Sequence, residues 1–315
     1  GLHAHDGFSV GDGLGYPNEH FDFAFENGLE AHSITNHGNM NSVPHMIQHL
    51  KKMRKNGKNF KAIFGVEAYF IPDLDEWREQ YEKAKENKRN KSLVKKNISA
   101  TVVEDEARKI KNILNRRRHL VLLARNQEGL NDLYKLISES YEPKNFYRYP
   151  RVDYKILEKY GSNLISTSAC LGGIYAGNYW ENRDDGEEAV LRAMRETSER
   201  MIGIFGDRWY GEVQWNNIPE QHELNQYVIK VCKEYNIELV STADSHYPRP
   251  EAWKDRELYK RLAWLGKKKP SWLSEELPES VDEIGYELYP KNGNQMWEAY
   301  KSYSAEAGFE YDDQL

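Results

Sequence analysis

Apolar and polar residues alternate along this chain with two different periodicities, one of which predicts β-strands and the other helices. Short apolar runs bounded by polar residues predict β-strands over residues 29–35, 61–69, 119–124, 163–170, 209–215 and 237–244. Longer stretches with apolar positions three and four residues apart predict helices over residues 18–27, 43–55, 129–140, 185–205 and 219–235. The repeated order of strand, helix and strand predicts an α/β fold with parallel strands.

Two parts of the chain depart from this alternation. Residues 73–118 are rich in Lys, Arg, Glu and Asn, and they predict an exposed charged insertion that ends in a helix over Val102–Arg116. After Tyr247 the periodicity weakens, and clustered Lys and Pro residues near position 267 mark a boundary. We therefore predict one main domain over residues 1–266 and a small helical C-terminal extension over residues 267–315.

Composition narrows the class of protein. The net charge is -6, which is not typical of a nucleic-acid-binding protein, although local basic patches can serve that purpose. Two cysteines cannot form a disulfide framework, which favours a reducing, intracellular setting. Neither a membrane-spanning stretch nor a signal peptide is visible. We expect a cytoplasmic protein with no membrane partner.

Residues of the types that bind metals recur at the ends of the predicted strands. His3 and His5 are two residues apart, so an extended backbone points both to one face, and Asp244 and His246 repeat this spacing near the other end. Each candidate follows or closes an apolar run, and the remaining members are Asp12, His37, Glu67, His119 and Cys170. Because the carboxyl ends of parallel strands share one face, we expect all of these side chains to meet there.

The chemistry of this set indicates a cluster of divalent cations. Imidazole, carboxylate and one thiolate suit Zn²⁺, Mn²⁺ or Fe²⁺ better than Ca²⁺ or Mg²⁺. Nine ligands are too many for one ion and fit two or three, with Glu67 as a natural bridge. An unpaired carboxylate among the apolar neighbours of Glu67 would be costly, and a cation would relieve that cost. Such clusters activate water and clamp phosphate oxygens during in-line displacement.

Six segments carry a family resemblance, and in chain order they read LHAHDGFSVGDG, ITNHGNMNSV, FGVEAYF, HLVLLARNQEGLNDLYKLIS, YPRVDYKILEKYGSNLISTSACLGGI and LVSTADSHYPRPEAW. Together they resemble the PHP domain (polymerase and histidinol phosphatase), in the version found at the N-terminus of bacterial DNA polymerase III alpha subunits. The resemblance runs from residue 2 to about residue 265. It implies a distorted (β/α)7 barrel with up to three metal ions at its carboxyl face.

The resemblance also implies how the ligands divide among the ions. One ion would be held by His3, His5, Glu67 and Asp244. A second would be held by Glu67, His119 and Cys170, and a third by Asp12, His37 and His246. Catalytic roles fall on Glu67, Asp244 and His246. Asn36 stands where the family usually has Asp, which predicts a weakened contact around the ligands and no lost ion.

Other polar and aromatic residues have less specific interpretations. Arg148 and Arg151 are candidates for binding a substrate phosphate, and structural salt bridges are an equal alternative. Arg116–Arg118 read as a solvated helix end, with contact to a nucleic-acid backbone as the alternative. Core positions are predicted for Trp209, Trp215 and Cys232. Surface or helix positions are predicted for His20, His32, His45, His49 and His222.

The resemblance and the ligand set together favour a metal-dependent phosphoesterase. The expected substrate is a DNA 3′ end, which gives a 3′→5′ exonuclease with a proofreading role. Because 315 residues leave no space for the palm, fingers and thumb of a polymerase, the expected partner is a separate polymerase polypeptide or another replisome protein. Two alternatives remain open: a phosphatase or pyrophosphatase of small molecules, and a metal-bound structural module that braces a polymerase.

Overall fold

The computed structural model describes residues 1–93, 115–266, 276–305 and 308. Its strands are β1 (Ala31–Ile34), β2 (Lys61–Phe70), β3 (Arg118–Ala124), β4 (Phe146–Tyr147), β5 (Tyr149–Val152), β6 (Leu164–Thr167), β7 (Trp209–Val213) and β8 (Leu239–Ser241). Its α-helices are α1 (Pro17–Glu26), α2 (Val43–Lys55), α3 (Leu74–Leu93), α5 (Gln127–Ser140), α6 (Tyr154–Tyr160), α7 (Ile174–Asn182), α8 (Glu187–Phe205), α9 (Pro219–Tyr235), α10 (Trp253–Ala263), α11 (Val281–Ile284) and α12 (Gly293–Tyr300). The helix predicted over Val102–Arg116 lies, except for its last two residues, outside the described part of the chain.

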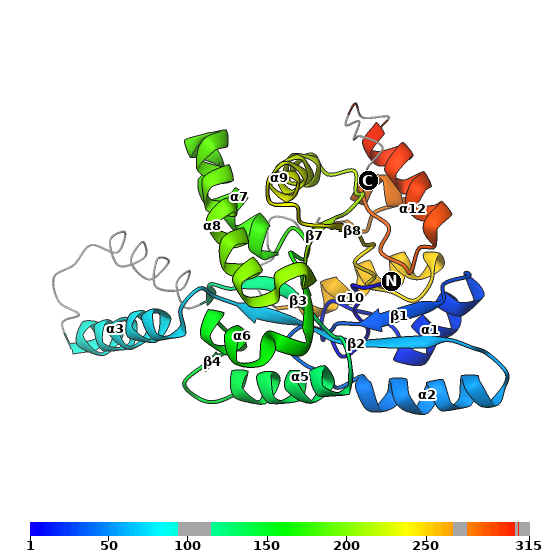
Figure 1. The fold of residues 1–315 in the computed structure, drawn as a ribbon, viewed down its shortest axis with the longest axis horizontal. Helices are drawn as coiled ribbons and strands as arrows, with labels where there is room; N and C mark the ends of the chain where they lie inside the picture. Colours follow the sequence, from blue (N-terminus) through cyan, green and yellow to red (C-terminus); the bar gives the residue numbers. More distant parts are fainter. Residues whose placement is uncertain (94–114, 267–275, 306–307, 309–315) are drawn as a thin grey trace.

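The strands form one curled sheet. Its order is β4-β5-β2-β3-β6-β7-β8, and β1 pairs with the first half of β2 (Figure 1). β1 and β2 are parallel, as are β6, β7 and β8. β3 is antiparallel to both of its neighbours, β2 and β6, which corrects the expectation of an entirely parallel arrangement.

The N-terminal segment joins the two ends of this sheet. On one side, Thr35 N donates to Ala4 O at 2.7 Å, next to β1. On the other side, His5 N donates to Ser245 O at 2.6 Å, just beyond β8. Residues 1–5 therefore act as a further strand, and with β1, β2, β3, β6, β7 and β8 they close a ring of seven. This confirms the predicted distorted (β/α)7 barrel.

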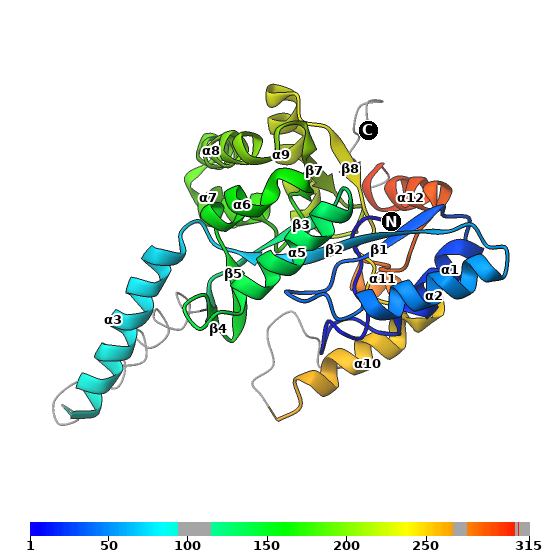
Figure 2. The same ribbon diagram turned by 60° about the horizontal axis from the view of Figure 1, so that its bottom comes forward.

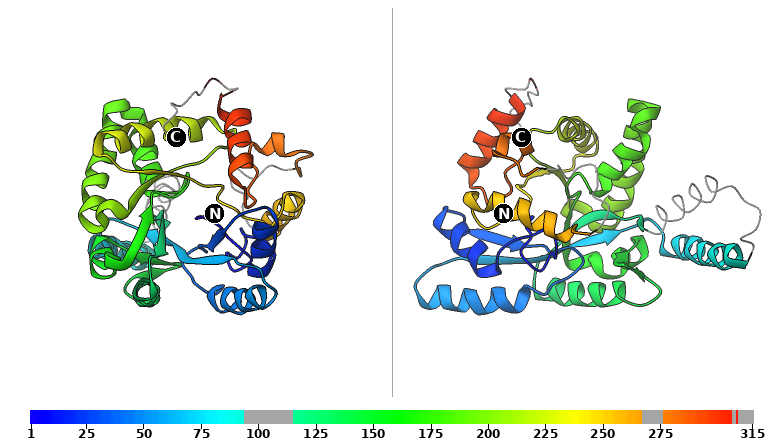
Figure 3. Two further views of the ribbon diagram at one scale, coloured as in Figure 1. Left: turned by 45° about the vertical axis from the view of Figure 1, so that its right-hand side comes forward. Right: turned by 180° about the vertical axis from the view of Figure 1, so that it is seen from behind.

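Alternation along each strand separates the inside of the barrel from the outside. Val66, Ala68 and Phe70 of β2 belong to the large core beneath the helices, whereas Glu67 between them points inward. In β3, Leu120 and Leu122 belong to the same outer core. Figure 3 shows the helices lying around the outside of the strands. A small inner cluster of Val121, Leu123 and Ala169 fills part of the barrel interior.

The two segments outside the alternation behave differently from each other. The charged insertion begins with α3, which projects away from the barrel in Figures 1 and 2. The described part of the extension packs on the barrel: Ala299 lies in the main core, and Asn27 Nδ2 donates to Gln295 Oε1 at 2.6 Å. The division of the chain at residues 266 and 267 stays a prediction. Within the described residues, none of the helices combines the length and apolar character needed to cross a bilayer.

Candidate metal centre

A buried carboxylate from β2 lies at the centre of the candidate site. Glu67 is fully buried, and four imidazole nitrogens approach its oxygens. His3 Nε2 lies 3.2 Å from Oε1, His5 Nε2 3.2 Å from Oε2, His37 Nδ1 2.6 Å from Oε2, and His119 Nδ1 3.1 Å from Oε1. The positive charge of the surrounding rings, His119 and His37 foremost, outweighs burial and lowers the pKa of Glu67 well below its ordinary value. Glu67 is therefore ionised at neutral pH.

Hydrogen bonds orient the two N-terminal histidines. His3 Nδ1 lies 2.7 Å from the buried Glu212 Oε1, a carboxylate that only accepts, so His3 donates through Nδ1. Ser9 Oγ gives its one hydrogen to Asn36 Oδ1 at 2.7 Å and must therefore accept from His5 Nδ1 at 2.9 Å. Burial, followed by the positive charge of His37 and His246, lowers the pKa of His5 to about 3, so its Nε2 carries a lone pair.

In this site, therefore, hydrogen-bond acceptor atoms point at one another, an arrangement that fits a bound cation. The lone pair of His5 Nε2 faces Glu67 Oε2 and, at 3.5 Å, Asp244 Oδ1. Both of these carboxylate oxygens are buried without a well-aligned hydrogen bond among the described residues, although His37 Nδ1 lies 2.6 Å from Glu67 Oε2. A tetrahedral zinc ion with ligands at about 2.0–2.1 Å separates its ligand atoms by about 3.3–3.4 Å. His3 Nε2 lies 3.3 Å from both His5 Nε2 and Asp244 Oδ1, which fits that spacing.

A second group shares Glu67 with two residues from neighbouring strands. Cys170 Sγ lies 3.8 Å from Glu67 Oε1 and 3.7 Å from His119 Nδ1. The backbone holds this pair together, because His119 N donates to Gly172 O at 2.8 Å. Burial and the negative charge of Glu67 raise the pKa of the Cys170 thiol well above its ordinary value. A cation at this place would favour the thiolate and offset that burial cost.

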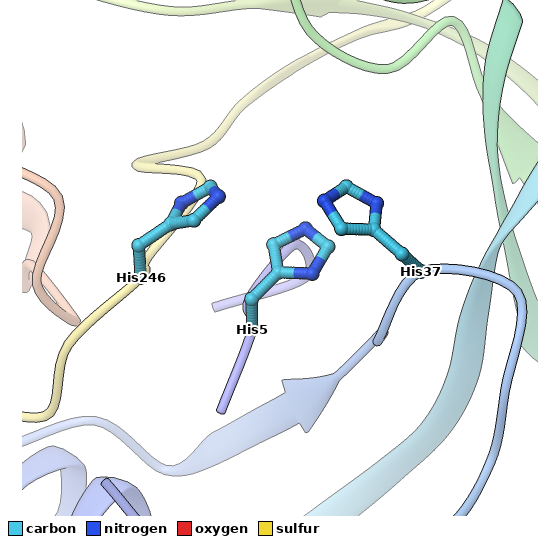
Figure 4. A group of neighbouring side chains, drawn as sticks. All are labelled: His5, His37 and His246. Carbon is cyan, nitrogen blue, oxygen red and sulfur yellow. The ribbon is translucent and has the colours of Figure 1, made fainter. Parts of the chain in front are cut away.

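A third group gathers around Asp12, in the loop after the N-terminal strand. Asp12 Oδ2 lies 3.1 Å from His37 Nε2 and 3.2 Å from His246 Nε2. Figure 4 shows the rings of His5, His37 and His246 around a common space, although they come from three separate parts of the chain. Arg256 of α10 donates to Asp12 Oδ1 at 2.5 Å, so the other carboxylate oxygen is left for the histidines.

Tight backbone geometry places these side chains. Asp244 and Ala169, next to Cys170, adopt positive φ angles of 45° and 59°, which non-glycine residues rarely do. Gly38, directly after His37, has φ of 62°, and a Cβ there would lie 2.8 Å from Pro150 Cγ and 3.2 Å from the Tyr69 ring. Such strain is typical of sites where the fold imposes a side-chain direction.

Members of all three groups line one open pocket of about 950 Å³. Asp12, His37, His119, Cys170, Asp244 and His246 all line it. Its walls carry the guanidinium groups of Arg117, Arg148 and Arg256. The pocket therefore combines carboxylates and imidazoles with positive charge, an arrangement that suits a phosphate group held beside cations.

Comparison with known proteins places this geometry in a family. The family model described as "PHP domain" matches residues 1–216, more than two thirds of the chain. The chain belongs to the PHP domain family. DNA polymerase III subunit alpha of Aquifex aeolicus is 32% identical over 268 residues, which cover 85% of this chain and 20% of that protein. The corresponding subunit of Campylobacter jejuni is 28% identical over 95% of this chain and 21% of its own length.

The chain thus spans about a fifth of the length of these curated relatives. Among solved structures, an amidohydrolase from Chromobacterium violaceum aligns with a TM-score of 0.40 and 11% identity, covering 82% of this chain and 95% of that one. This structural likeness is weak, and membership of the PHP family rests on the sequence match.

The structure brings all nine of the candidate ligands together, but it separates the two candidate phosphate-binding arginines. Arg148 is exposed and lines the pocket. Arg151 is fully buried, and its guanidinium donates to the carbonyl oxygens of Arg116, Tyr147 and Tyr149. This position corrects the prediction that Arg151 contacts substrate and favours the structural alternative, because a group enclosed in this way cannot reach a ligand in the pocket.

Predictions for other residues have mixed outcomes. Trp209, Trp215 and Cys232 are buried as expected. His32 corrects the surface-or-helix prediction, since it lies on β1 and is fully buried. His20 and His222 lie on helices, as predicted, but with buried side chains.

Sequence reasoning missed three residues that orient the candidate ligands, namely Ser9, Glu212 and Arg256. Glu212 had a signal comparable to that of Glu67, because it is a carboxylate within the apolar strand WYGEVQW. Asn36 forms side-chain hydrogen bonds with Ser9, Asp6 N, Asp6 Oδ1 and Ser42, and the weakened contact expected from the loss of a carboxylate there stays a prediction. Ser9 and Arg256 had no distinctive local pattern, and only the fold brings them to the site.

Proposed function

We propose that this chain is a metal-dependent phosphoesterase that removes nucleotides from DNA 3′ ends, with two or three Zn²⁺, Mn²⁺ or Fe²⁺ ions as cofactors. One observation carries the proposal: nine side chains of metal-binding type converge, and His5 Nε2 lies 3.2 Å from Glu67 Oε2 and 3.5 Å from Asp244 Oδ1, two buried oxygens that lack a well-aligned hydrogen bond among the described residues. A site built only for stability would pair each acceptor with a donor.

The distances support the ligand groups that the family resemblance implies. His3, His5, Glu67 and Asp244 would hold one ion; Glu67, His119 and Cys170 a second; and Asp12, His37 and His246 a third. Divalent cations at such a site supply an activated water and neutralise charge on a phosphate.

The chain's own residues would orient the substrate and hold protons. Burial alone would raise the pKa of Asp244, but His3, His246 and His5 lower it, so its carboxylate is ionised and able to accept a proton. His246 donates its Nδ1 proton to Asp244 O at 2.7 Å, which directs Nε2 toward Asp12 and the pocket. Arg148 is placed to contact substrate phosphate oxygens.

DNA is the substrate class that the relatives favour, since they are named as subunits of a DNA polymerase. A polymerase polypeptide or another replisome protein is the corresponding partner. The two alternatives make different demands on the same pocket. A phosphatase of small molecules would turn over a mononucleotide ester at least as well as a strand, and a structural module would bind metal without turnover.

The test compares the wild-type chain with the double variant His5→Ala, Asp244→Ala and the control His45→Ala, an exposed histidine on α2. Each metal-loaded protein is given a primed DNA whose recessed strand is labelled at its 5′ end, and p-nitrophenyl phosphate in parallel. We expect the wild type and the control to shorten the primer and the double variant to lose more than 100-fold in rate.

Degradation by the double variant at the wild-type rate would refute the proposal. Faster turnover of the small ester than of DNA by the wild type would favour the phosphatase. Stoichiometric metal with a large loss of thermal stability on chelation, and no turnover of either substrate, would favour the structural module.

A further inference from the structure

One wall of the pocket carries an arginine held by two aromatic rings. The guanidinium carbon of Arg117 lies 3.8 Å from the centre of the Tyr149 ring and 5.2 Å from that of Tyr69. The two rings meet edge to face, with centres 5.1 Å apart and an interplanar angle of 68°. Arg117 also donates from Nη1 to Asn115 O at 3.1 Å. These contacts fix the side chain before any ligand arrives, which lowers the entropy cost of binding.

Among the residues that the structure describes, no carboxylate compensates the charge of Arg117. In the described ranges no acidic side chain lies within ion-pair distance of Arg117 or of Arg148, and Arg117 Nε is buried without an acceptor. Burial, followed by the positive charge of Arg117, lowers the pKa of nearby Arg151 to about 10. The charges of Arg117 and Arg151 therefore lie close together, and an anion bound by Arg117 would offset their repulsion.

This wall lies next to the metal centre but not in it. The Tyr69 ring stacks on His37 with centres 5.8 Å apart and lies 5.6 Å from the ring of His119. Tyr69 therefore stands beside both Arg117 and the candidate ligands. A phosphate bound by Arg117 would therefore lie beside the metal centre, which suits a phosphate next to the one under attack.

We infer that Arg117, held between Tyr69 and Tyr149, binds the phosphodiester adjacent to the scissile one in a nucleic-acid strand, with Arg148 as a second contact at the pocket rim. This inference deepens the proposed function, because it names a strand of at least two nucleotides as the substrate of that site. A guanidinium stacked on an aromatic face is also compatible with a neighbouring base, since such stacking tolerates any sequence.

Direct binding tests the subsite without turnover. Fluorescently labelled oligo(dT) of ten nucleotides is titrated with chelator-treated protein, and anisotropy is followed at several salt concentrations. Arg117→Met keeps the length of the side chain but removes the charge. We expect it to weaken binding by about tenfold and to lower the slope of log K against log salt by about one. Arg148→Met should act in the same direction with a smaller effect.

The control is Arg125→Met, because Arg125 is exposed and follows the opposite end of β3. Arg117→Lys keeps a point charge but not the stacked plane, so we expect partial recovery of affinity. In the metal-loaded protein, Arg117→Met should raise KM for the oligonucleotide and leave KM for a p-nitrophenyl ester of thymidine monophosphate nearly unchanged.

The inference is overturned if both Arg117→Met and Arg148→Met, with melting temperatures like the wild type, bind the oligonucleotide as Arg125→Met does. It is also overturned if Arg117→Met weakens competition by inorganic phosphate but keeps oligonucleotide affinity, since the subsite would then serve a small phosphate. Arginine-dependent binding by a chain that never cleaves DNA would support the strand-binding role of Arg117 and refute the proposed function. Cleavage with no effect of either arginine would do the reverse.

Discussion

Replacing Glu212 with glutamine removes one negative charge behind His3 while it keeps the shape of the side chain. Glu212 is buried, and its carboxylate accepts hydrogen bonds from His3 Nδ1 at 2.7 Å, Thr242 Oγ1 at 2.6 Å and Gln214 Nε2 at 3.0 Å, as well as from Thr167 Oγ1. A carboxylate only accepts, so Glu212 holds the Nδ1 proton of His3, and Nε2 of the same ring faces Glu67 and Asp244. An amide offers two donor hydrogens to the same neighbours.

The size of the effect follows from the role of such a partner. Loss of a hydrogen-bond partner behind a metal-binding histidine typically costs about 10–100-fold in metal affinity. A tenfold change in affinity corresponds to about 1.4 kcal/mol, so the expected loss is about 1.4–2.7 kcal/mol. The amide also leaves at least one buried donor or acceptor unpaired, which costs about 1–3 kcal/mol of folding free energy. Glu212→Gln should therefore weaken metal binding and moderately lower stability.

The assay is competition between the protein and a chelator of known affinity at pH 7.5, with metal content measured on the same samples. Glu223→Gln is the matched control, because Glu223 is an exposed glutamate that accepts a hydrogen bond from Tyr179 on the outside of the barrel. A folded Glu212→Gln protein whose metal affinity stays within threefold of the wild type would refute the reasoning: either His3 does not bind metal, or its orientation does not depend on Glu212.

Three further changes should alter stability. In a sample whose free metal concentration is about 100 times the Kd, removal of the metal should lower the free energy of unfolding by about 2.7 kcal/mol. Calorimetry should show this as a fall of about 5 °C in Tm. Asn36→Asp places a second carboxylate against Asp6 Oδ1, which now accepts from Asn36 Nδ2 at 2.8 Å, and should destabilise the fold by about 1–3 kcal/mol in urea titrations. Burial holds the pKa of His32 well below 6.5, so below that pH the unfolded chain binds the extra proton and wild-type stability falls. His32→Leu should make stability less dependent on pH between 6.5 and 5, measured by urea unfolding at each pH.

Exposed residues on or near α2 serve as controls for two of these changes. Asn41→Asp and His45→Leu should leave stability within about 0.5 kcal/mol of the wild type, as most surface substitutions do. An equal pH slope for the wild type and His32→Leu would mean that His32 is solvated in the folded state. If Asn36→Asp left the stability unchanged, the contact with Asp6 would not be formed. If the Tm did not change when the metal was chelated, folding would not be linked to metal binding.

The local sequence pattern was sufficient to predict an element where the periodicity of that element determines which of its faces packs against the core. The helices predicted over residues 43–55 and 219–235 coincide with α2 and α9, since each carries a proline in its first turn and an apolar stripe that faces the core. Strand ends were less accurate: the run over residues 237–244 shortens to β8 over Leu239–Ser241. Its last residues leave the ladder to carry Asp244, whose φ is positive.

The sequence also determined which residue types stand at the strand ends, and this was enough to name the nine side chains that meet in the structure. One premise was wrong in detail. His119 precedes its apolar run and does not close it, yet it reaches the same end of the barrel, because β3 runs antiparallel to its neighbours. The start of an antiparallel strand lies beside the ends of parallel ones, so the prediction of convergence held for a reason that the pattern did not contain.

Strand direction, ring closure and depth of burial were decided only by the tertiary structure. Nothing near residue 5 specifies its hydrogen bond to Ser245, and nothing in the local sequence distinguishes the buried Arg151 from Arg148 at the pocket rim. Periodicity records which side of an element is apolar, because that side must leave water. It does not record which distant segment packs against that side. The charged side chains of Glu212, Arg256 and Arg117 each take their role from such a distant segment.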